Sequence, residues 1–92
     1  MPFVRLTPRF ESARRKFVRH NKKMSQQIQG SLMRFAKNPQ HQSLRLEKLQ
    51  GSKVWTIRVD RGNRLFFIWS DAGDTAIFFL VGPHDAYRKL GN

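Results

Sequence analysis

Hydrophobic side chains follow two different spacings along the chain, and the spacing changes near residue 53. Before that point they recur every three or four residues, as on one face of a helix. Two such stripes are visible: Phe10, Ala13 and Phe17, then Ile28, Leu32, Phe35 and Ala36. After it, hydrophobic and polar residues alternate or form short apolar runs, which is typical of strands. The pattern therefore predicts two helices followed by a β-meander.

The boundaries of the helices follow from local signals. A short strand over residues 3–7 leads into Thr7-Pro8, where Thr is a favourable N-cap and Pro suits the first helical position. The polar residues 20–23 separate the helices, Ser25 is a possible cap of the second, and Asn38-Pro39 ends it. Residues 40–53 are expected to form a polar loop.

Three strands are predicted in the second half, over residues 54–60, 64–70 and 75–81, the last ending at Gly82-Pro83. An odd-numbered loop, Arg61-Gly62-Asn63, places Arg58 and Arg64 on one face of the sheet. The element order is β-α-α-β-β-β. It predicts an α+β fold, a single domain over residues 1–92 in which two N-terminal helices pack on an antiparallel sheet of about four strands.

The two faces of this sheet follow from pairing Ser70 with Thr75. That register puts Phe67 opposite Phe78 and Leu65 opposite Leu80, which makes the core face. The opposite face then carries four large apolar residues: Phe66, Ile68, Ile77 and Phe79. Either a partner docks on them, or the C-terminal residues 84–92 cover them.

Charge narrows the range of functions. The chain carries 18 Lys and Arg against 6 Asp and Glu, a net charge of +12. Residues 1–50 hold twelve of the cations against two glutamates. Such an excess favours a polyanionic partner, which relieves the self-repulsion. The N-terminus has no signal-peptide pattern and no apolar run is long enough to span a membrane, so we expect a cytoplasmic protein with no membrane partner.

Candidate chemistry follows the last predicted strand, where His84, Asp85 and Tyr87 stand beside two cations. Residues just beyond a strand end can hold chemistry on a rigid support. The chain has no cysteine, which excludes disulfides, thiol nucleophiles and Cys-based zinc sites. Its three histidines are scattered without ligand spacing, so no metal or other cofactor is expected.

The order of elements and their residues resembles the RelE/ParE superfamily of bacterial toxins from type II toxin–antitoxin pairs. The matching segments run along nearly the whole chain: Leu46-Glu47-Lys48-Leu49-Gln50-Gly51, Val54-Trp55-Thr56-Ile57-Arg58-Val59, Arg64-Leu65-Phe66-Phe67 and Val81-Gly82-Pro83-His84-Asp85-Ala86-Tyr87. RelE-like members cut messenger RNA in the ribosomal A site, whereas ParE-like members inhibit DNA gyrase without catalytic residues. The charge favours the first branch.

The resemblance implies a catalytic set of Arg58, Arg64, His84 and Tyr87. In a 2′-hydroxyl attack on the neighbouring phosphate, guanidinium groups stabilise the developing charge and His84 transfers a proton. Tyr87 either stacks on a base or assists proton transfer. Thr56 stands where some ribosome-dependent members have Lys, and Glu47 or Asp85 must reach in if a carboxylate is the base.

Structural alternatives stand beside each of these roles. In the structural alternative, Arg58 and Arg64 form salt bridges with Asp60 and Asp85. His84 then caps the strand end, and Tyr87 belongs to the core and closes the sheet over Phe66 and Phe79. On the functional interpretation, RNA phosphates contact seven further cations: Arg14, Arg15, Lys22, Lys23, Lys48, Lys53 and Arg61.

The expected partners are therefore messenger RNA and ribosomal RNA on the ribosome, together with a cognate acidic antitoxin. A ParE-like gyrase inhibitor, with DNA gyrase as its partner, and a non-catalytic nucleic-acid-binding relative remain as alternatives.

Overall fold

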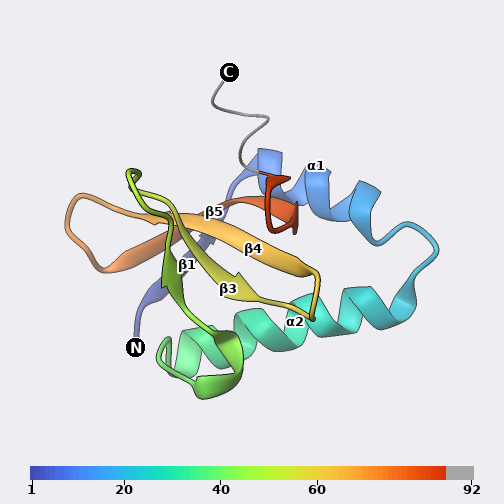
Figure 1. Cartoon of the computed structure of the whole chain (residues 1–92), viewed down its shortest axis with the longest axis horizontal. Coiled ribbons are helices and arrows are strands. Elements are labelled where there is room, and N and C mark those ends of the chain that lie inside the picture. Colours follow the sequence, from blue (N-terminus) through green and yellow to red (C-terminus); the bar gives the residue numbers. More distant parts are fainter. Residues whose placement is uncertain (87–92) are drawn as a thin grey trace.

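The computed structural model describes residues 1–86, in which two helices pack on one face of a five-stranded sheet. The order along the chain is β1 (Phe3–Leu6), α1 (Pro8–Phe17), α2 (Lys22–Lys37), a short 3₁₀ helix η1 (Gln42–Leu44), β2 (Glu47–Lys48), β3 (Trp55–Arg58), β4 (Asn63–Trp69) and β5 (Thr75–Pro83). Figure 1 shows the helices as a hairpin beside the twisted sheet. The predicted α+β fold with two N-terminal helices is confirmed.

The sheet has the strand order β1-β5-β4-β3-β2. β2 to β5 pair with antiparallel neighbours, but β1 runs parallel to β5, so the sheet is mixed rather than wholly antiparallel. The additional strand β2 falls within residues 40–53, which were expected to be loop. It pairs with Thr56 and Trp55 of β3. Because it is only two residues long, it has no alternating pattern from which a strand could be predicted.

The helix caps agree only in part with the sequence prediction. Thr7 caps α1 as expected: its hydroxyl oxygen accepts the Phe10 N–H at 3.0 Å and its hydroxyl donates to the Phe78 carbonyl at 2.9 Å. The prediction of Ser25 as the cap of α2 is wrong. Asn21 caps that helix, because its side-chain oxygen accepts the Met24 N–H at 3.0 Å.

An aromatic cluster joins both helices to the sheet. Phe78 of β5 packs edge-on against Phe10 of α1 and Phe35 of α2, with ring centroids 5.9 and 5.4 Å apart. Phe67 of β4 lies beside Phe78 at 4.9 Å. These four rings are fully buried, and Figure 1 shows β5 passing next to α1.

A β-bulge changes the expected pairing of β4 with β5. Phe67 faces Phe78 as predicted, but the register shifts between Phe66 and Phe67, so Leu65 faces Val81 and Phe66 faces Leu80. The prediction of Leu65 opposite Leu80 is therefore wrong. An extra residue on one strand moves every later side chain by one position, and Leu80 falls on the face away from the helices.

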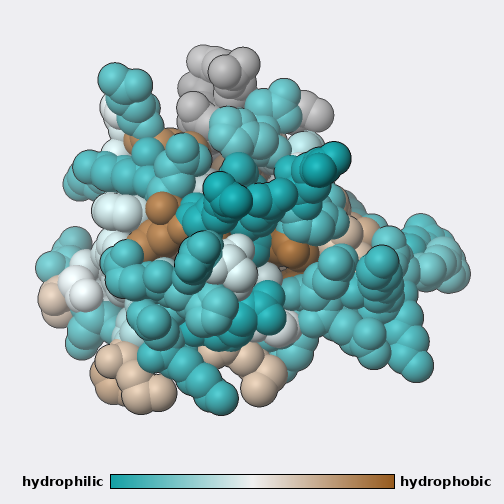
Figure 2. All heavy atoms as spheres, turned by 60° about the horizontal axis from the view of Figure 1, so that its bottom comes forward, coloured by the Kyte–Doolittle hydropathy of each residue, from teal (hydrophilic) through white to brown (hydrophobic). Residues whose placement is uncertain are grey.

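That second face is less open than its sequence predicted. Phe66 is fully buried, Ile77 and Phe79 are half-buried, and Ile68 is 36% exposed. The alternative that residues 84–92 cover this face falls partly on residues 87–92, which lie outside the described part of the chain. On the side that Figure 2 shows, hydrophilic residues dominate and hydrophobic atoms appear only in small separate areas.

α2 is tied to the sheet by one buried polar contact. Ser31 is fully buried and its hydroxyl donates to the Arg58 carbonyl at 3.1 Å. This bond sets the distance between α2 and the end of β3, where Arg58 lies.

We expect Ser31→Ala to lower the free energy of unfolding by about 1–2 kcal/mol relative to Ser25→Ala, because it leaves a carbonyl without a donor. Ser25 lies on the same helix but is exposed, so it reports the helix-propensity gain of the same substitution. Urea denaturation of both variants measures the difference. Equal effects at the two positions would show that the hydroxyl contributes nothing.

Candidate active site at the end of the sheet

Two arginines face each other at the end of the β3–β4 hairpin. Arg58 is the last residue of β3, and its Cα partner on β4 is Arg64. Directly opposed residues in an antiparallel pair have Cβ atoms about 5 Å apart and share a face. Both residues are half-buried. The prediction that Arg58 and Arg64 share a face is confirmed, although the strands leave residues 59–62 between them rather than the expected loop 61–63.

No carboxylate neutralises this arginine pair within residues 1–86. Arg58 Nε donates to the backbone carbonyl of Asp60 at 3.1 Å, and the described residues show no hydrogen-bond or ion-pair partner for the Arg64 side chain. The Asp60 carboxylate instead closes the hairpin, accepting the N–H groups of Gly62 at 3.0 Å and Asn63 at 2.9 Å. The alternative of salt bridges to Asp60 and Asp85 is therefore not found.

A carboxylate does lie on the same face, one strand further out. Glu47 of β2 pairs with Thr56, and Thr56 precedes Arg58 by two residues on β3. Side chains two apart on a strand point to the same side. Glu47 is exposed. The sheet register therefore brings Glu47, Arg58 and Arg64 to one side, although they are separated along the sequence.

His84 follows the third strand of this end of the sheet. Gly82 of β5 pairs with Arg64, and His84 lies two residues further on in a turn. A Cβ at position 82 would lie 3.0 Å from the Ala86 Cβ, so the returning chain packs closely against this glycine. His84 and Asp85 are exposed in that turn, and the imidazole makes no hydrogen bond within the described residues. The strand-capping alternative for His84 therefore has no supporting bond, and Tyr87 lies outside the described residues.

β5 itself continues to Pro83, so the prediction that it stops before Gly82-Pro83 is wrong. Pro83 occupies the last position, opposite Asn63, where the loss of one N–H donor is tolerated.

Thr56 is the least expected feature of this face. Its side chain is fully buried beside its cross-strand partner Phe66, and its hydroxyl has no hydrogen-bond partner among residues 1–86. A buried hydroxyl without a partner costs about 1–3 kcal/mol. Sequence patterning could not reveal it, because Thr is an ordinary strand residue.

The cations predicted to bind RNA come from separate parts of the fold. Lys22 and Lys23 are exposed in the first turn of α2, Lys48 lies on the edge strand β2, Lys53 precedes β3, and Arg61 is exposed in the β3–β4 hairpin.

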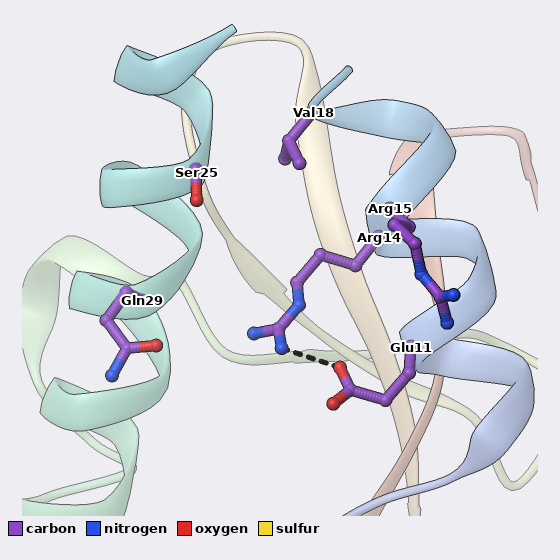
Figure 3. Close-up of a pocket in the computed structure, with 6 residues that line it drawn as sticks. All are labelled: Glu11, Arg14, Arg15, Val18, Ser25 and Gln29. Atoms are coloured by element: carbon purple, nitrogen blue, oxygen red, sulfur yellow. Dashed lines mark ion pairs between the residues drawn. The ribbon is translucent and has the colours of Figure 1, made fainter. Parts of the chain in front are cut away.

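Arg14 and Arg15 of α1 line a pocket of about 290 Å³ between the helices, faced by Ser25 and Gln29 of α2 (Figure 3). Arg14 is already engaged there, 2.6 Å from Glu11 and over the Phe10 ring at 5.8 Å.

A second basic pocket was not predicted. It has a volume of about 500 Å³ and is lined by Arg34, His41, Arg45 and Arg58, among others. Arg34 is an exposed residue of α2, and His41 and Arg45 lie in the segment after it, so nothing in the sequence indicates that they come together. Residues 1–86 contain no cluster of three potential metal-ligating side chains, and no helix there has the length and apolar character to cross a membrane.

Comparison with solved structures identifies the fold as that of the RelE/ParE-superfamily toxins. YafQ from E. coli strain BL21(DE3) superposes with a TM-score of 0.71 at 14% identity, covering 100% of both chains. A YoeB/ParE toxin from Agrobacterium tumefaciens gives 0.67 at 16%, covering 89% of this chain and 98% of that one. In the YoeB–YefM complex from Staphylococcus aureus the values are 0.64 and 20%, with coverage of 91% and 98%.

Two further matching structures are E. coli complexes, DinJ–YafQ and the intact RelBE toxin–antitoxin complex. No protein-family model and no curated protein matches the sequence.

We expect Thr56→Val to raise the free energy of unfolding by about 1 kcal/mol, because it replaces an unpaired buried hydroxyl by a methyl group of the same shape. Thr75→Val is the matched control. The Thr75 hydroxyl donates to the Asp74 carboxylate at 3.1 Å, so its removal should not raise the free energy of unfolding. Thermal denaturation of both variants checks this. A loss of stability in Thr56→Val would mean that the hydroxyl has a partner after all.

Proposed function

We propose that this chain is the toxin of a type II toxin–antitoxin pair, a single-domain, ribosome-dependent endoribonuclease that cleaves messenger RNA by 2′-hydroxyl attack. The observation that carries the proposal is the directly opposed pair Arg58 and Arg64, which lacks a neutralising carboxylate in the described part of the chain. Two uncompensated guanidinium groups on one face repel each other, and a phosphate between them removes that repulsion. The net charge of +12 supports an RNA ligand.

The proposed reaction divides between groups on the same face. A general base removes the proton from the 2′-hydroxyl, whose oxygen attacks phosphorus and forms a cyclic 2′,3′-phosphate. The bond from phosphorus to the 5′ oxygen breaks, and a general acid protonates that oxygen. Arg58 and Arg64 stabilise the charge on the non-bridging oxygens.

We assign the base to Glu47 and the acid to His84. Glu47 is the carboxylate that the β2–β3 register places on this face, and it is exposed. His84 lies beyond the opposite strand, in the turn after β5. An acid and a base on opposite sides of the arginine pair suit an in-line displacement, in which the attacking and leaving oxygens lie on opposite sides of phosphorus. Tyr87 keeps its proposed role of stacking on a base or assisting proton transfer.

The proposed partners follow from charge and from the similar structures. YafQ, YoeB and RelE are each found with an antitoxin, DinJ, YefM and RelB respectively. We propose a cognate acidic antitoxin for this chain, and contacts of the dispersed cations with messenger and ribosomal RNA. A toxin with that target acts in the cytoplasm.

A ParE-like gyrase inhibitor is the second candidate. It is favoured by Thr56, a neutral and buried residue at a strand position where some RNA-cleaving relatives have Lys. Primer extension on messenger RNA after brief induction separates the two functions. Codon-aligned cuts support cleavage, whereas intact messenger RNA together with stalled gyrase supports inhibition.

We expect Arg64→Ala and His84→Ala each to lower RNA cleavage by roughly 10²-fold or more, because a charge-stabilising or proton-transferring group is lost. The control is Arg5→Ala, which removes the same charge from an exposed position of β1, the edge strand at the other end of the sheet from β2. Cleavage of ribosome-bound messenger RNA by purified, folded variants is the measurement. Full activity in His84→Ala would remove His84 from the mechanism.

We also expect the acidic protein encoded beside this gene to bind through both charge and apolar contact. Affinity should fall at high salt without disappearing, since salt screens charges but not apolar burial. Calorimetric titration at about 0.05 and 0.5 M salt tests this. Absence of binding at both concentrations, with folded samples, would contradict the antitoxin proposal while leaving the fold assignment intact.

A further inference from the structure

The pocket of about 500 Å³ lies where α2, η1 and the end of β3 meet. It is lined by Arg34 of α2, His41 and Ser43 at η1, Arg45 just after η1, and Arg58 of β3. Arginines from three different elements therefore line one hollow.

The fold holds these elements together by specific contacts. The Ser31 hydroxyl donates to the Arg58 carbonyl at 3.1 Å, which fixes α2 against the end of β3. Arg34 follows Ser31 by three residues and so lies on the same side of the helix. Arg45 has a left-handed backbone with φ of 48°, and its N–H bonds the Gln42 carbonyl at 3.3 Å to close the 3₁₀ turn. The pocket is thus a built feature of the fold.

The charge in the pocket is uncompensated. No Asp or Glu among residues 1–86 lines it, and the salt bridge found in that part of the chain joins Glu11 to Arg14 elsewhere. Two carboxylates follow lining arginines by two residues: Asp60 is occupied by the hairpin N–H groups, and Glu47 does not line the pocket. Like charges gathered in a hollow raise the local affinity for an anion.

His41 adds a ring nitrogen to this set. Its Nδ1 accepts the Ser43 N–H at 3.2 Å, and the Ser43 hydroxyl lies 2.9 Å from the same nitrogen. A neutral ring that accepts at Nδ1 carries its hydrogen on Nε2, so that nitrogen is a donor. With Nδ1 as the acceptor, the Ser43 hydroxyl donates to the ring, and His41 Nε2 is the donor that remains beside the arginines.

We propose that this pocket binds a phosphate group of the RNA backbone, the one beside the phosphate held by the Arg58–Arg64 pair. The proposal rests on the proposed function. Phosphate fits because guanidinium forks chelate its oxygens in pairs, and because it offers more acceptors than a carboxylate does. Arg58 belongs to both places: it faces Arg64 across the hairpin and also lines the pocket. A strand of RNA leaving the candidate active site therefore meets this pocket next.

Binding of a 2′-O-methyl trinucleotide, which lacks the attacking hydroxyl, tests the pocket without cleavage. We expect Arg34→Gln and Arg45→Asn each to weaken its binding roughly tenfold, since each removes charged hydrogen bonds to phosphate. Asn is chosen at position 45 because it tolerates a left-handed backbone. The control is Arg9→Gln, which removes one charge from an exposed position on α1 away from the pocket and should weaken binding less than about twofold. Inorganic pyrophosphate should compete for the wild-type pocket.

Cleavage of the unmodified RNA gives a second readout. Both pocket variants should raise KM and leave kcat within about twofold, because the pocket holds the strand and does not touch the reacting phosphate. Circular dichroism and thermal denaturation confirm that each variant folds.

Equal losses in all three variants would overturn the proposal, since they would show a general charge effect. It is also overturned if pyrophosphate binds but the trinucleotide does not compete, which indicates a free nucleotide, or if only an acidic peptide occupies the pocket. If the wild type cleaves no RNA while the pocket variants still bind the trinucleotide more weakly than Arg9→Gln, the proposed function fails and the phosphate site stands.

Discussion

The packing of Phe78 is the contact on which the arrangement of the fold depends. One ring touches Phe10 of α1, Phe35 of α2 and Phe67 of β4, and all four are fully buried. Removing such a ring from a core costs about 3–5 kcal/mol, a large part of the stability of a domain this size. Because side chains alternate along a strand, this contact also assigns the opposite face of the sheet. The helices take one side, and Arg58 and Arg64 are left on the other.

The candidate active site carries a stability cost that the fold offsets elsewhere. Arg58 and Arg64 face each other without a carboxylate in the described region, and Thr56 buries a hydroxyl beside them without a partner. Asp60, the acid best placed to neutralise the arginines, instead accepts hydrogen bonds from the hairpin backbone. The carboxylate therefore stiffens the loop that positions the two cations and leaves their charge available to a ligand.

The proposed phosphate pocket and the arginine pair share one structural support. The Ser31 hydroxyl bonds the carbonyl of Arg58, the residue that belongs to both places. α2 thus contributes Arg34 to the pocket while holding the end of β3 in position. A ligand that bridges the two places would stabilise the junction of helix, turn and hairpin as a unit.

The sequence by itself determined the class of fold, both helices, the three strands of the meander and the shared face of Arg58 and Arg64. Those features follow from hydrophobic spacing, caps and the parity of a loop, all of which act between near neighbours. Only the tertiary structure decided the parallel pairing of β1 with β5, the bulge that turns Leu80 away from the core, and the register that brings Glu47 to Thr56. The tertiary structure alone also decided that Arg34, Arg45 and Arg58 line one pocket. Each joins segments distant in sequence through packing and backbone hydrogen bonds, which leave no periodic signal in the segments themselves.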